Sequence, residues 1–162
     1  MEKKYLMTRT GFAKLVAELN NLIKVERPKV IDSIKESRAY GGELSENSEY
    51  LEAKDQQESL EKKISDLQMR LDNARVIDIE KVVSDGVVRF GTIVKLLDLD
   101  TDSEVSYQIV GEEESSIKEG KISYLSPIAI AMMNKRIGDL IYFRIPKGER
   151  ELEILEINTH KA

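Results

Sequence analysis

Two adjacent glycines, Gly41 and Gly42, separate two long segments that each have the hydrophobic spacing of an α-helix. Glycine adopts left-handed backbone conformations without a Cβ penalty, so a doubled glycine can end a helix and let the chain reverse. Two helices joined by a short turn pack antiparallel and carry that turn at their far end. The sequence therefore predicts a helical hairpin whose tip is formed by residues 41–50.

The first arm of this hairpin is predicted from about residue 8 to residue 38. Thr8 or Thr10 can cap its start by accepting a hydrogen bond from a backbone N–H. Pro28 lies inside the pattern and removes one helical hydrogen bond, so we expect a kink there. Glu26 takes the one seam position without an apolar side chain. The apolar positions follow spacings of three, four or seven, and they are Phe12, Val16, Leu19, Ile23, Val30 and Ile34.

The second arm has a cleaner pattern, because its seam alternates spacings of three and four without a break. The seam consists of Tyr50, Ala53, Gln57, Leu60, Ile64, Leu67, Leu71 and Ala74, with Gln57 as its polar member. The residues between the seam positions are mostly charged or amide, as a solvated outer face requires. Two arms of about thirty residues, rising about 1.5 Å per residue, give a rod on the order of 45 Å long.

The tip carries three carboxylates, those of Glu43, Glu46 and Glu49. Glu43 and Glu46 are three residues apart across the start of the second arm, which Ser45 or Asn47 can cap, so their carboxylates can converge on a hard cation. Mg²⁺ in proteins is typically held by one or two carboxylates together with substrate phosphates and waters. We predict that Glu43 and Glu46 form half of a metal site that another molecule completes. The alternative is a solvated acidic loop.

Positive charge also lies on both arms toward the tip, at Arg27, Lys29, Lys35, Arg38 and Lys54. An ordinary charged helix surface is one explanation, and a track for a phosphate backbone is the other. The formal net charge of −5 argues against a protein dominated by nucleic-acid binding, although it leaves room for a local basic patch.

The pattern changes after Asp78, where short β-branched or alternating runs replace the helical spacing. Five strands are predicted, at residues 87–90, 92–97, 104–110, 140–145 and 151–157. Ser126 and Pro127 are a cap followed by a proline at the first helical position, so they predict a short helix over 127–133. The expected organisation is an N-terminal antiparallel coiled-coil hairpin (1–78), a small α+β domain (79–158) and a polar tail (159–162).

Several functional classes receive little support from the composition. The chain has no cysteine, which removes disulfides, zinc–thiolate sites and cysteine nucleophiles and fits a reducing cytoplasm. Its single histidine, His160, lies in the polar tail, and no glycine-rich phosphate loop is present. No apolar run has membrane-spanning length, and the start of the chain lacks the apolar core of a signal peptide. We therefore do not expect a self-contained enzyme or a membrane partner.

The sequence resembles the Gre family of bacterial transcript-cleavage factors over nearly its whole length. The residues that carry the resemblance in the first half are Met7-Thr8 with Gly11, Lys14-Leu15 with Glu18-Leu19, Arg27-Pro28, the tip Leu44-Ser45-Glu46-Asn47-Ser48-Glu49-Tyr50, Ala53-Lys54 with Gln57, and Ala74 with Val76-Ile77-Asp78. Those in the second half are Tyr107-Gln108-Ile109-Val110-Gly111, Ile122-Ser123, Ser126-Pro127-Ile128-Ala129, Gly138-Asp139, and Pro146 with Gly148.

This resemblance implies a coiled-coil hairpin followed by an FKBP-like domain in a monomeric protein. It implies that the second domain, through Ser126 and Pro127, docks on RNA polymerase at the rim of its secondary channel. The hairpin then enters the channel, where Glu43 and Glu46 help to hold an Mg²⁺ shared with the polymerase active site. Arg38 and Lys54 contact the 3′ end of the nascent RNA. The polymerase, and not the factor, hydrolyses the backtracked transcript by two-metal chemistry.

The chain departs from the family pattern at two places. The family tip usually reads Gly-Asp-Leu-x-Glu-Asn, whereas this chain has Glu43 in place of the aspartate and a turn that is one residue longer through Gly41 and Gly42. Ile130 stands where many members have a basic residue. The altered tip keeps open a paralogue that occupies the channel and regulates or inhibits the polymerase without cleavage. A prolyl isomerase or chaperone is a third reading, which the 6% aromatic content disfavours.

Overall fold

The computed structural model describes residues 3–39, 43 and 46–159. The chain divides into two compact units. The first contains Met1–Lys4 and Phe12–Ala74, and the second contains Tyr5–Gly11 and Arg75–Ala162. An α+β fold with an N-terminal helical hairpin is therefore confirmed. Within the described ranges, no helix is both long enough and apolar enough to cross a membrane.

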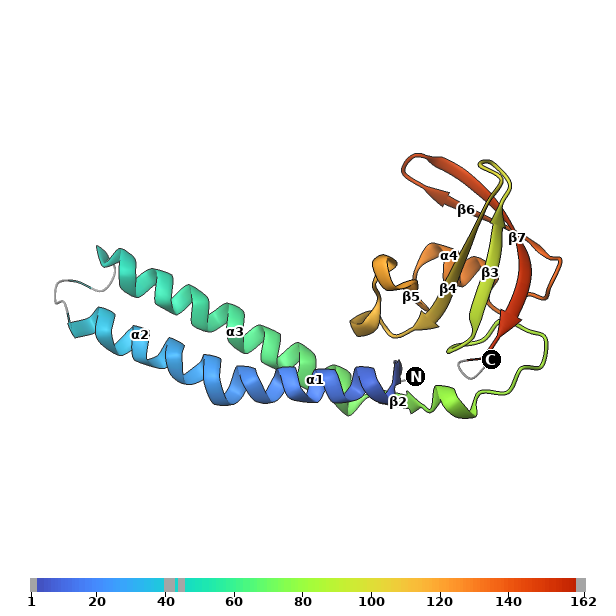
Figure 1. Cartoon of the computed structure of the whole chain (residues 1–162). Helices are drawn as coiled ribbons and strands as arrows, with labels where there is room; N and C mark the ends of the chain where they lie inside the picture. Colours follow the sequence, from blue (N-terminus) through green and yellow to red (C-terminus); the bar gives the residue numbers. More distant parts are fainter. Residues whose placement is uncertain (1–2, 40–42, 44–45, 160–162) are drawn as a thin grey trace. The chain divides into compact units, whose positions relative to one another are not determined.

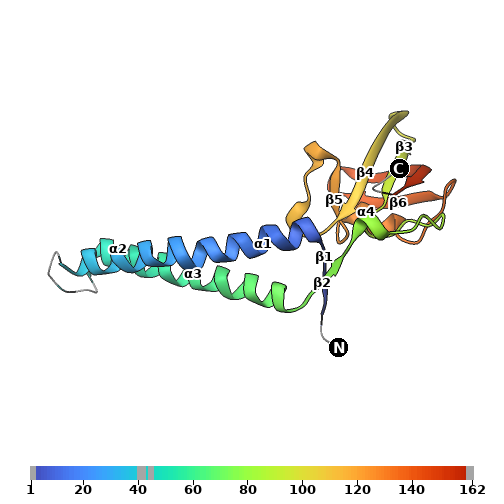
Figure 2. The same cartoon turned by 60° about the horizontal axis from the view of Figure 1, so that its bottom comes forward.

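The first unit is the predicted hairpin, in which the two arms lie side by side and antiparallel (Figures 1 and 2). One arm is helical throughout and consists of α1 (Arg9–Asn21), a π-helical turn (Leu22–Glu26) and α2 (Arg27–Ala39). The other arm is a single helix, α3 (Ser48–Asp72). Thr8 caps the first arm as predicted, because its hydroxyl accepts a hydrogen bond from the Gly11 N–H at 3.0 Å.

The interruption expected near Pro28 takes the form of the π-helical turn that directly precedes it. There the Arg27 N–H donates to the carbonyl of Leu22, five residues back, instead of four as in an α-helix. Proline lacks an N–H, and its ring clashes with the carbonyl four residues earlier. The wider turn therefore falls where the regular α-helical hydrogen-bond ladder is disturbed.

The predicted seam is buried only in part, and its other positions are half-buried. The buried apolar residues of the arms are Leu15, Leu19, Leu22, Ile34, Ala53, Ile64 and Leu67, and Ser37 is buried with them. Leu15, Leu22 and Ser37 were not among the predicted seam positions. A bidentate pair also crosses the hairpin, in which Arg27 donates to both carboxylate oxygens of Glu61 at 2.8 Å. These bonds raise the pKa of Arg27.

The second unit contains a five-stranded sheet with the order β5-β4-β3-β7-β6, which curls in Figure 1. In this sheet β4 and β5 are parallel, and the other three pairs of neighbouring strands are antiparallel. The strands are β3 (Ile93–Asp98), β4 (Ser103–Val110), β5 (Lys121–Ser123), β6 (Leu140–Ile145) and β7 (Gly148–Asn158). Short 3₁₀ turns occur at Ile79–Lys81, Glu112–Glu114 and Ile117–Glu119.

The predicted short helix is confirmed as α4 (Pro127–Met132). Ser126 caps it, since its hydroxyl accepts a hydrogen bond from the Ala129 N–H at 3.3 Å. Ala129 and Met132 are fully buried in the core of the second unit, together with apolar side chains from the sheet. The helix therefore covers the sheet, as its apolar sequence predicts.

One predicted strand, at residues 87–90, is wrong. Val87 forms only an isolated bridge with Arg136, and the chain then turns at Gly91, whose φ is +89°. The side chain of Thr92 stabilises this turn by donating to the Arg89 carbonyl at 2.6 Å. The apolar run is real, because Val88 is fully buried, but it fills the core without joining the sheet.

Two further strands lie outside the main sheet and were not predicted. They are β1 (Tyr5–Thr8) and β2 (Ala74–Ile77), which form a two-stranded sheet of their own. The Leu6 N–H donates to the Tyr124 hydroxyl at 3.2 Å. A Cβ on Gly111 would lie 2.8 Å from the Leu6 carbonyl oxygen, so glycine permits this close approach. The first strand of the chain is therefore a structural part of the second unit.

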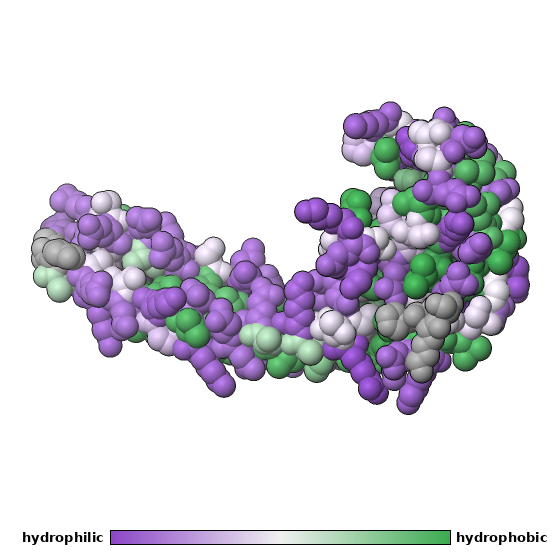
Figure 3. Space-filling model, in the orientation of Figure 1, coloured by the Kyte–Doolittle hydropathy of each residue, from purple (hydrophilic) through white to green (hydrophobic). Residues whose placement is uncertain are grey.

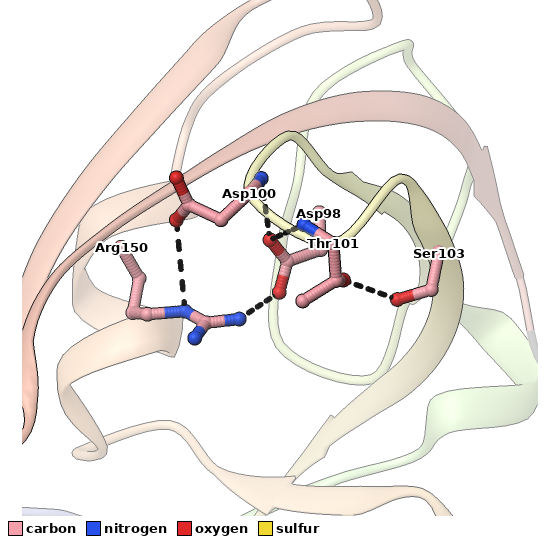
Figure 4. A network of polar contacts seen from close by, with 5 residues as sticks. All are labelled: Asp98, Asp100, Thr101, Ser103 and Arg150. Atoms are coloured by element: carbon pink, nitrogen blue, oxygen red, sulfur yellow. Dashed lines mark hydrogen bonds and ion pairs between the residues drawn. The ribbon is translucent and has the colours of Figure 1, made fainter.

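A polar network joins the β3–β4 turn to β7 (Figure 4). The Asp98 carboxylate accepts hydrogen bonds from the N–H groups of Asp100 and Thr101, at 2.9 and 3.3 Å, and pairs with Arg150. Burial acts to raise the pKa of Asp98, but the backbone N–H bonds and Arg150 outweigh it, so the pKa is lowered. The Thr101 and Ser103 hydroxyls, 2.6 Å apart, close the turn.

Candidate functional site

The two predicted metal-binding acids, Glu43 and Glu46, both lie exposed at the tip of the hairpin. They are joined through the backbone, because the Glu46 N–H donates to the Glu43 carbonyl at 3.1 Å. This bond keeps the two residues on one tight turn, so their side chains start from neighbouring points of the chain. The predicted glycine turn at Gly41 and Gly42 and the alternative cap Ser45 lie outside the described residues.

Asn47 is the residue that caps the second arm. Its side-chain oxygen accepts a hydrogen bond from the Tyr50 N–H at 3.0 Å, which satisfies a donor in the first turn of α3. Glu49 adds a negative charge to that turn, where the helix dipole favours an anion. Glu49 also lines a shallow hollow of about 300 Å³ between the arms, together with Glu36 and Glu52.

The two predicted RNA-binding residues lie around Tyr50. The guanidinium carbon of Arg38 is 5.5 Å from the centroid of the Tyr50 ring, a cation–π distance. Lys54 lies one helical turn after Tyr50 on α3 and donates to Gln57 at 3.1 Å. Both basic side chains belong to exposed residues and can reach a ligand. In contrast, Arg27 is engaged by Glu61 in the bidentate pair described above, so it is less suited to a phosphate contact.

The predicted docking residues belong to the second unit. Ser126 caps α4, and Pro127 is the first residue of that helix. Ile130, the departure from the family pattern, is 62% exposed on the same helix. It lines an open pocket of about 440 Å³ in which Phe90 and Tyr124 are the aromatic members.

Two carboxylates at the tip are too few donors to complete a metal site by themselves. In the part of the chain that the structure describes, no three Asp, Glu, His or Cys side chains gather closely enough to hold a metal ion. Two carboxylates on one turn are oxygen donors of the kind that Mg²⁺ prefers, but they leave most of its six positions open. Phosphates, waters or another protein would have to supply the remaining ligands.

One of the two contacts of Asn47 could be predicted from the sequence, and the other could not. Asn47 is a common helix-capping residue and was one of two candidates for the cap. Its second contact, a hydrogen bond from Nδ2 to the Ser37 carbonyl at 2.9 Å, was not foreseen. A side-chain bond across ten positions of sequence leaves no periodic pattern, and only the packing of the two arms reveals it.

Comparison with known proteins gives matches along both parts of the chain. The family model "Transcription elongation factor, N-terminal" matches residues 5–76, and "Transcription elongation factor, GreA/GreB, C-term" matches residues 83–159. Transcription elongation factor GreA of Alkalilimnicola ehrlichii is 47% identical over 95% of this chain and 97% of its own length. GreA of Desulfotalea psychrophila is 48% identical over 94% of both chains.

Among solved structures, GreA factor homolog 1 of Thermus thermophilus is a weaker match. It is 24% identical, with a TM-score of 0.43 over 96% of this chain and 99% of its own. The two family models together cover nearly the whole chain, and the GreA relatives cover it at well above 40% identity. The chain therefore belongs to the GreA/GreB family of transcription elongation factors.

Proposed function

We propose that this protein binds RNA polymerase through its secondary channel and stimulates hydrolytic cleavage of backtracked nascent RNA by the polymerase, which releases paused or arrested complexes. The observation that carries the proposal is the tip of the hairpin, where Glu43 and Glu46 are joined by a backbone hydrogen bond on one exposed turn. Such a pair buries little apolar surface and adds little to stability, so its value lies in what it can bind.

In this proposal each part of the chain has a separate task. Ser126 and Pro127 dock the second unit on the polymerase, and the hairpin carries Glu43 and Glu46 to the active site. Glu43 and Glu46 would help to hold Mg²⁺ there, and the bound ion would supply a Lewis acid for activating water and for stabilising charge on the phosphate. The two carboxylates contribute oxygen ligands and orient the water. The factor is thus not itself the enzyme, and it acts as a monomer in the cytoplasm.

Arg38 and Lys54 are proposed to hold the 3′ segment of the nascent RNA. Both residues are exposed, and both flank Tyr50, close to the turn that carries the acids. A guanidinium held over an aromatic ring loses little further freedom when it binds a phosphate. This arrangement favours a basic RNA contact over an ordinary solvated helix surface.

Two other functions remain as alternatives. A paralogue that blocks the channel without cleavage is less favoured, because curated relatives that are 43–47% identical over nearly the whole chain are named GreA. A prolyl isomerase receives no support from those names. The deciding measurement is RNA cleavage in purified backtracked complexes with and without the protein. No stimulation at any Mg²⁺ concentration, in complexes that still bind the protein, would refute the proposed function and favour the blocking paralogue.

Removing the charges of Arg38 and Lys54 should weaken contact with the RNA. In an Arg38→Ala, Lys54→Ala variant we expect crosslinking to the RNA 3′ end to fall severalfold, and the remaining crosslinking to depend less on salt, because fewer counterions are released. The matched control is Lys24→Ala, Lys62→Ala, which removes two exposed charges from the same arms farther from the tip. Equal crosslinking in the two variants would mean that Arg38 and Lys54 belong to an ordinary charged surface.

The second unit should bind RNA polymerase without the hairpin. A fragment starting at residue 79 is a poor test, because it lacks Tyr5–Gly11, which belongs to that unit. We suggest replacing residues 12–73 with a short glycine–serine linker, so that β1 and β2 are both retained. This variant should compete with the full chain for polymerase but give no cleavage stimulation. Failure of the folded variant to compete would assign docking to the hairpin instead.

A further inference from the structure

Asn47 contacts both arms of the hairpin at the base of the tip. Its side-chain oxygen accepts from the Tyr50 N–H at 3.0 Å, and its side-chain nitrogen donates to the Ser37 carbonyl at 2.9 Å. The first bond lies within α3 and the second reaches the last turn of α2. One amide side chain therefore ties the end of one helix to the start of the other.

Both partners of Asn47 are groups that a helix cannot satisfy by itself. The first four N–H groups and the last four carbonyls of a helix have no partner within it. Tyr50 lies in the first turn of α3, and Ser37 lies among the last residues of α2, which ends at Ala39. Asparagine suits this place because its side chain offers an acceptor and a donor together. Aspartate and serine can also cap a helix. An ionised aspartate, however, has no donor for the Ser37 carbonyl, and the serine hydroxyl is on a shorter side chain than the asparagine amide.

Small, buried side chains surround this bond on both arms. Ser37 is 4% exposed and Ala53 on the facing arm is 5% exposed, so small side chains let the two helices approach closely near the tip. The Ser37 hydroxyl is turned back onto its own helix, where it donates to the Ile34 carbonyl at 2.8 Å. At this point of the hairpin it is therefore the carbonyl of Ser37, and not its hydroxyl, that contacts the other arm.

The fixed position of Asn47 extends to the acids that precede it. Glu46 is its neighbour in the chain, and the Glu46 N–H donates to the Glu43 carbonyl at 3.1 Å. A continuous series of bonds thus runs from Ser37 through Asn47 and Glu46 to Glu43. We infer that Asn47 is a positioning residue, which holds the Glu43–Glu46 pair in place through its bond to Ser37. This inference rests on the proposed function for its catalytic consequence.

The cleavage test compares variants that keep the cap and lose the bond to Ser37. Asn47→Ser and Asn47→Asp both retain an oxygen for the Tyr50 N–H, and only the second adds a charge. We expect both to lower the maximal cleavage rate at least about tenfold, because errors on the order of 1 Å in a catalytic site cost up to about 100-fold. The factor concentration that gives half-maximal stimulation should not change, since docking is elsewhere. The Mg²⁺ concentration that gives half-maximal cleavage should be higher for both variants than for the wild type.

Asn73→Ser is the matched control for these variants. Asn73 ends α3 and donates to the Met69 carbonyl at 2.8 Å, so its replacement removes one bond of the same kind from the opposite end of the same helix. Its cleavage rate should equal that of the wild type. Wild-type rates in both Asn47 variants would overturn the inference, and so would an equal loss in the Asn73 control, since that would indicate a general loss of helix stability.

A second measurement does not depend on polymerase. ¹⁵N relaxation of the free protein should give lower order parameters at Glu43 and Glu46 in Asn47→Ser than in the wild type, with Tyr50 unchanged. If the wild-type protein does not stimulate cleavage, the proposed function fails, and this measurement alone decides whether Asn47 fixes the acids. Unchanged order parameters at Glu43 and Glu46 would refute the inference that Asn47 fixes the acids.

Discussion

Replacing Glu46 with glutamine should lower transcript cleavage at least about 100-fold while binding to polymerase stays unchanged. Glutamine keeps the shape of the side chain but cannot supply a charged oxygen to a hard cation. Glu46 is exposed, so the substitution removes no buried contact that docking or folding could need. The measurement is the maximal cleavage rate in backtracked complexes, together with competition for polymerase.

Glu58→Gln is the control for this prediction, because Glu58 is an exposed acid farther along α3. It removes the same charge and should leave cleavage unchanged. Glu43→Asp then tests the unusual tip. If the longer turn compensates for the longer side chain, shortening the side chain alone should lower the rate. If Glu43 is a defect, the same change should raise it. Full activity of Glu46→Gln would exclude the carboxylate pair as the cation ligand.

Replacing Asp98 with asparagine should lower the free energy of unfolding by about 1–3 kcal/mol at neutral pH. Loss of one partner of a buried ion pair costs more than this, but Arg150 is 33% exposed and water can take over part of its solvation. Asp100→Asn is the control, because Asp100 is 53% exposed and lies 3.9 Å from Arg150. Its effect should stay below about 1 kcal/mol.

The effect of Asp98 should depend on pH in a defined direction. Its pKa is lowered in the folded protein, so the folded state favours the charged carboxylate more than the unfolded state does. The stabilisation is therefore present above the unfolded pKa of about 3.9 and is lost as the pH falls through the lower folded value. Denaturant unfolding of wild type and Asp98→Asn should give curves of stability against pH that converge below about pH 4. A constant difference between them would contradict this explanation.

The sequence predicted the elements whose side chains repeat with a clear period. The seam of α3 and the strands β3, β4, β6 and β7 follow from such repeats, and α4 follows from a cap and a proline. The strand expected at residues 87–90 failed because an apolar run alone does not distinguish a strand from a buried loop. The strands β1, β2 and β5 are three or four residues long, which is too short for a period to show.

At the candidate site, the sequence singled out residues whose roles stay a prediction, whereas the contacts between them could not be foreseen. Glu43 and Glu46 stand out by charge and spacing, and Arg38 and Lys54 by their place near the tip. The backbone bond between the acids and the contact of Arg38 with Tyr50 depend on how the chain reverses. Those details come from packing and hydrogen bonding between the arms, which residue patterns along one segment do not encode.

The place of β1 in the second unit has a consequence for how the protein folds. Tyr5–Gly11 must rejoin Arg75–Ala162 across residues 12–74. If this segment were a flexible loop, closing it would cost chain entropy worth on the order of 4 kcal/mol. A formed hairpin is no longer a flexible loop, because its two ends lead directly into β1 and β2, which are hydrogen-bonded neighbours. A hairpin formed before the second unit closes would thus reduce the entropy cost of completing that unit.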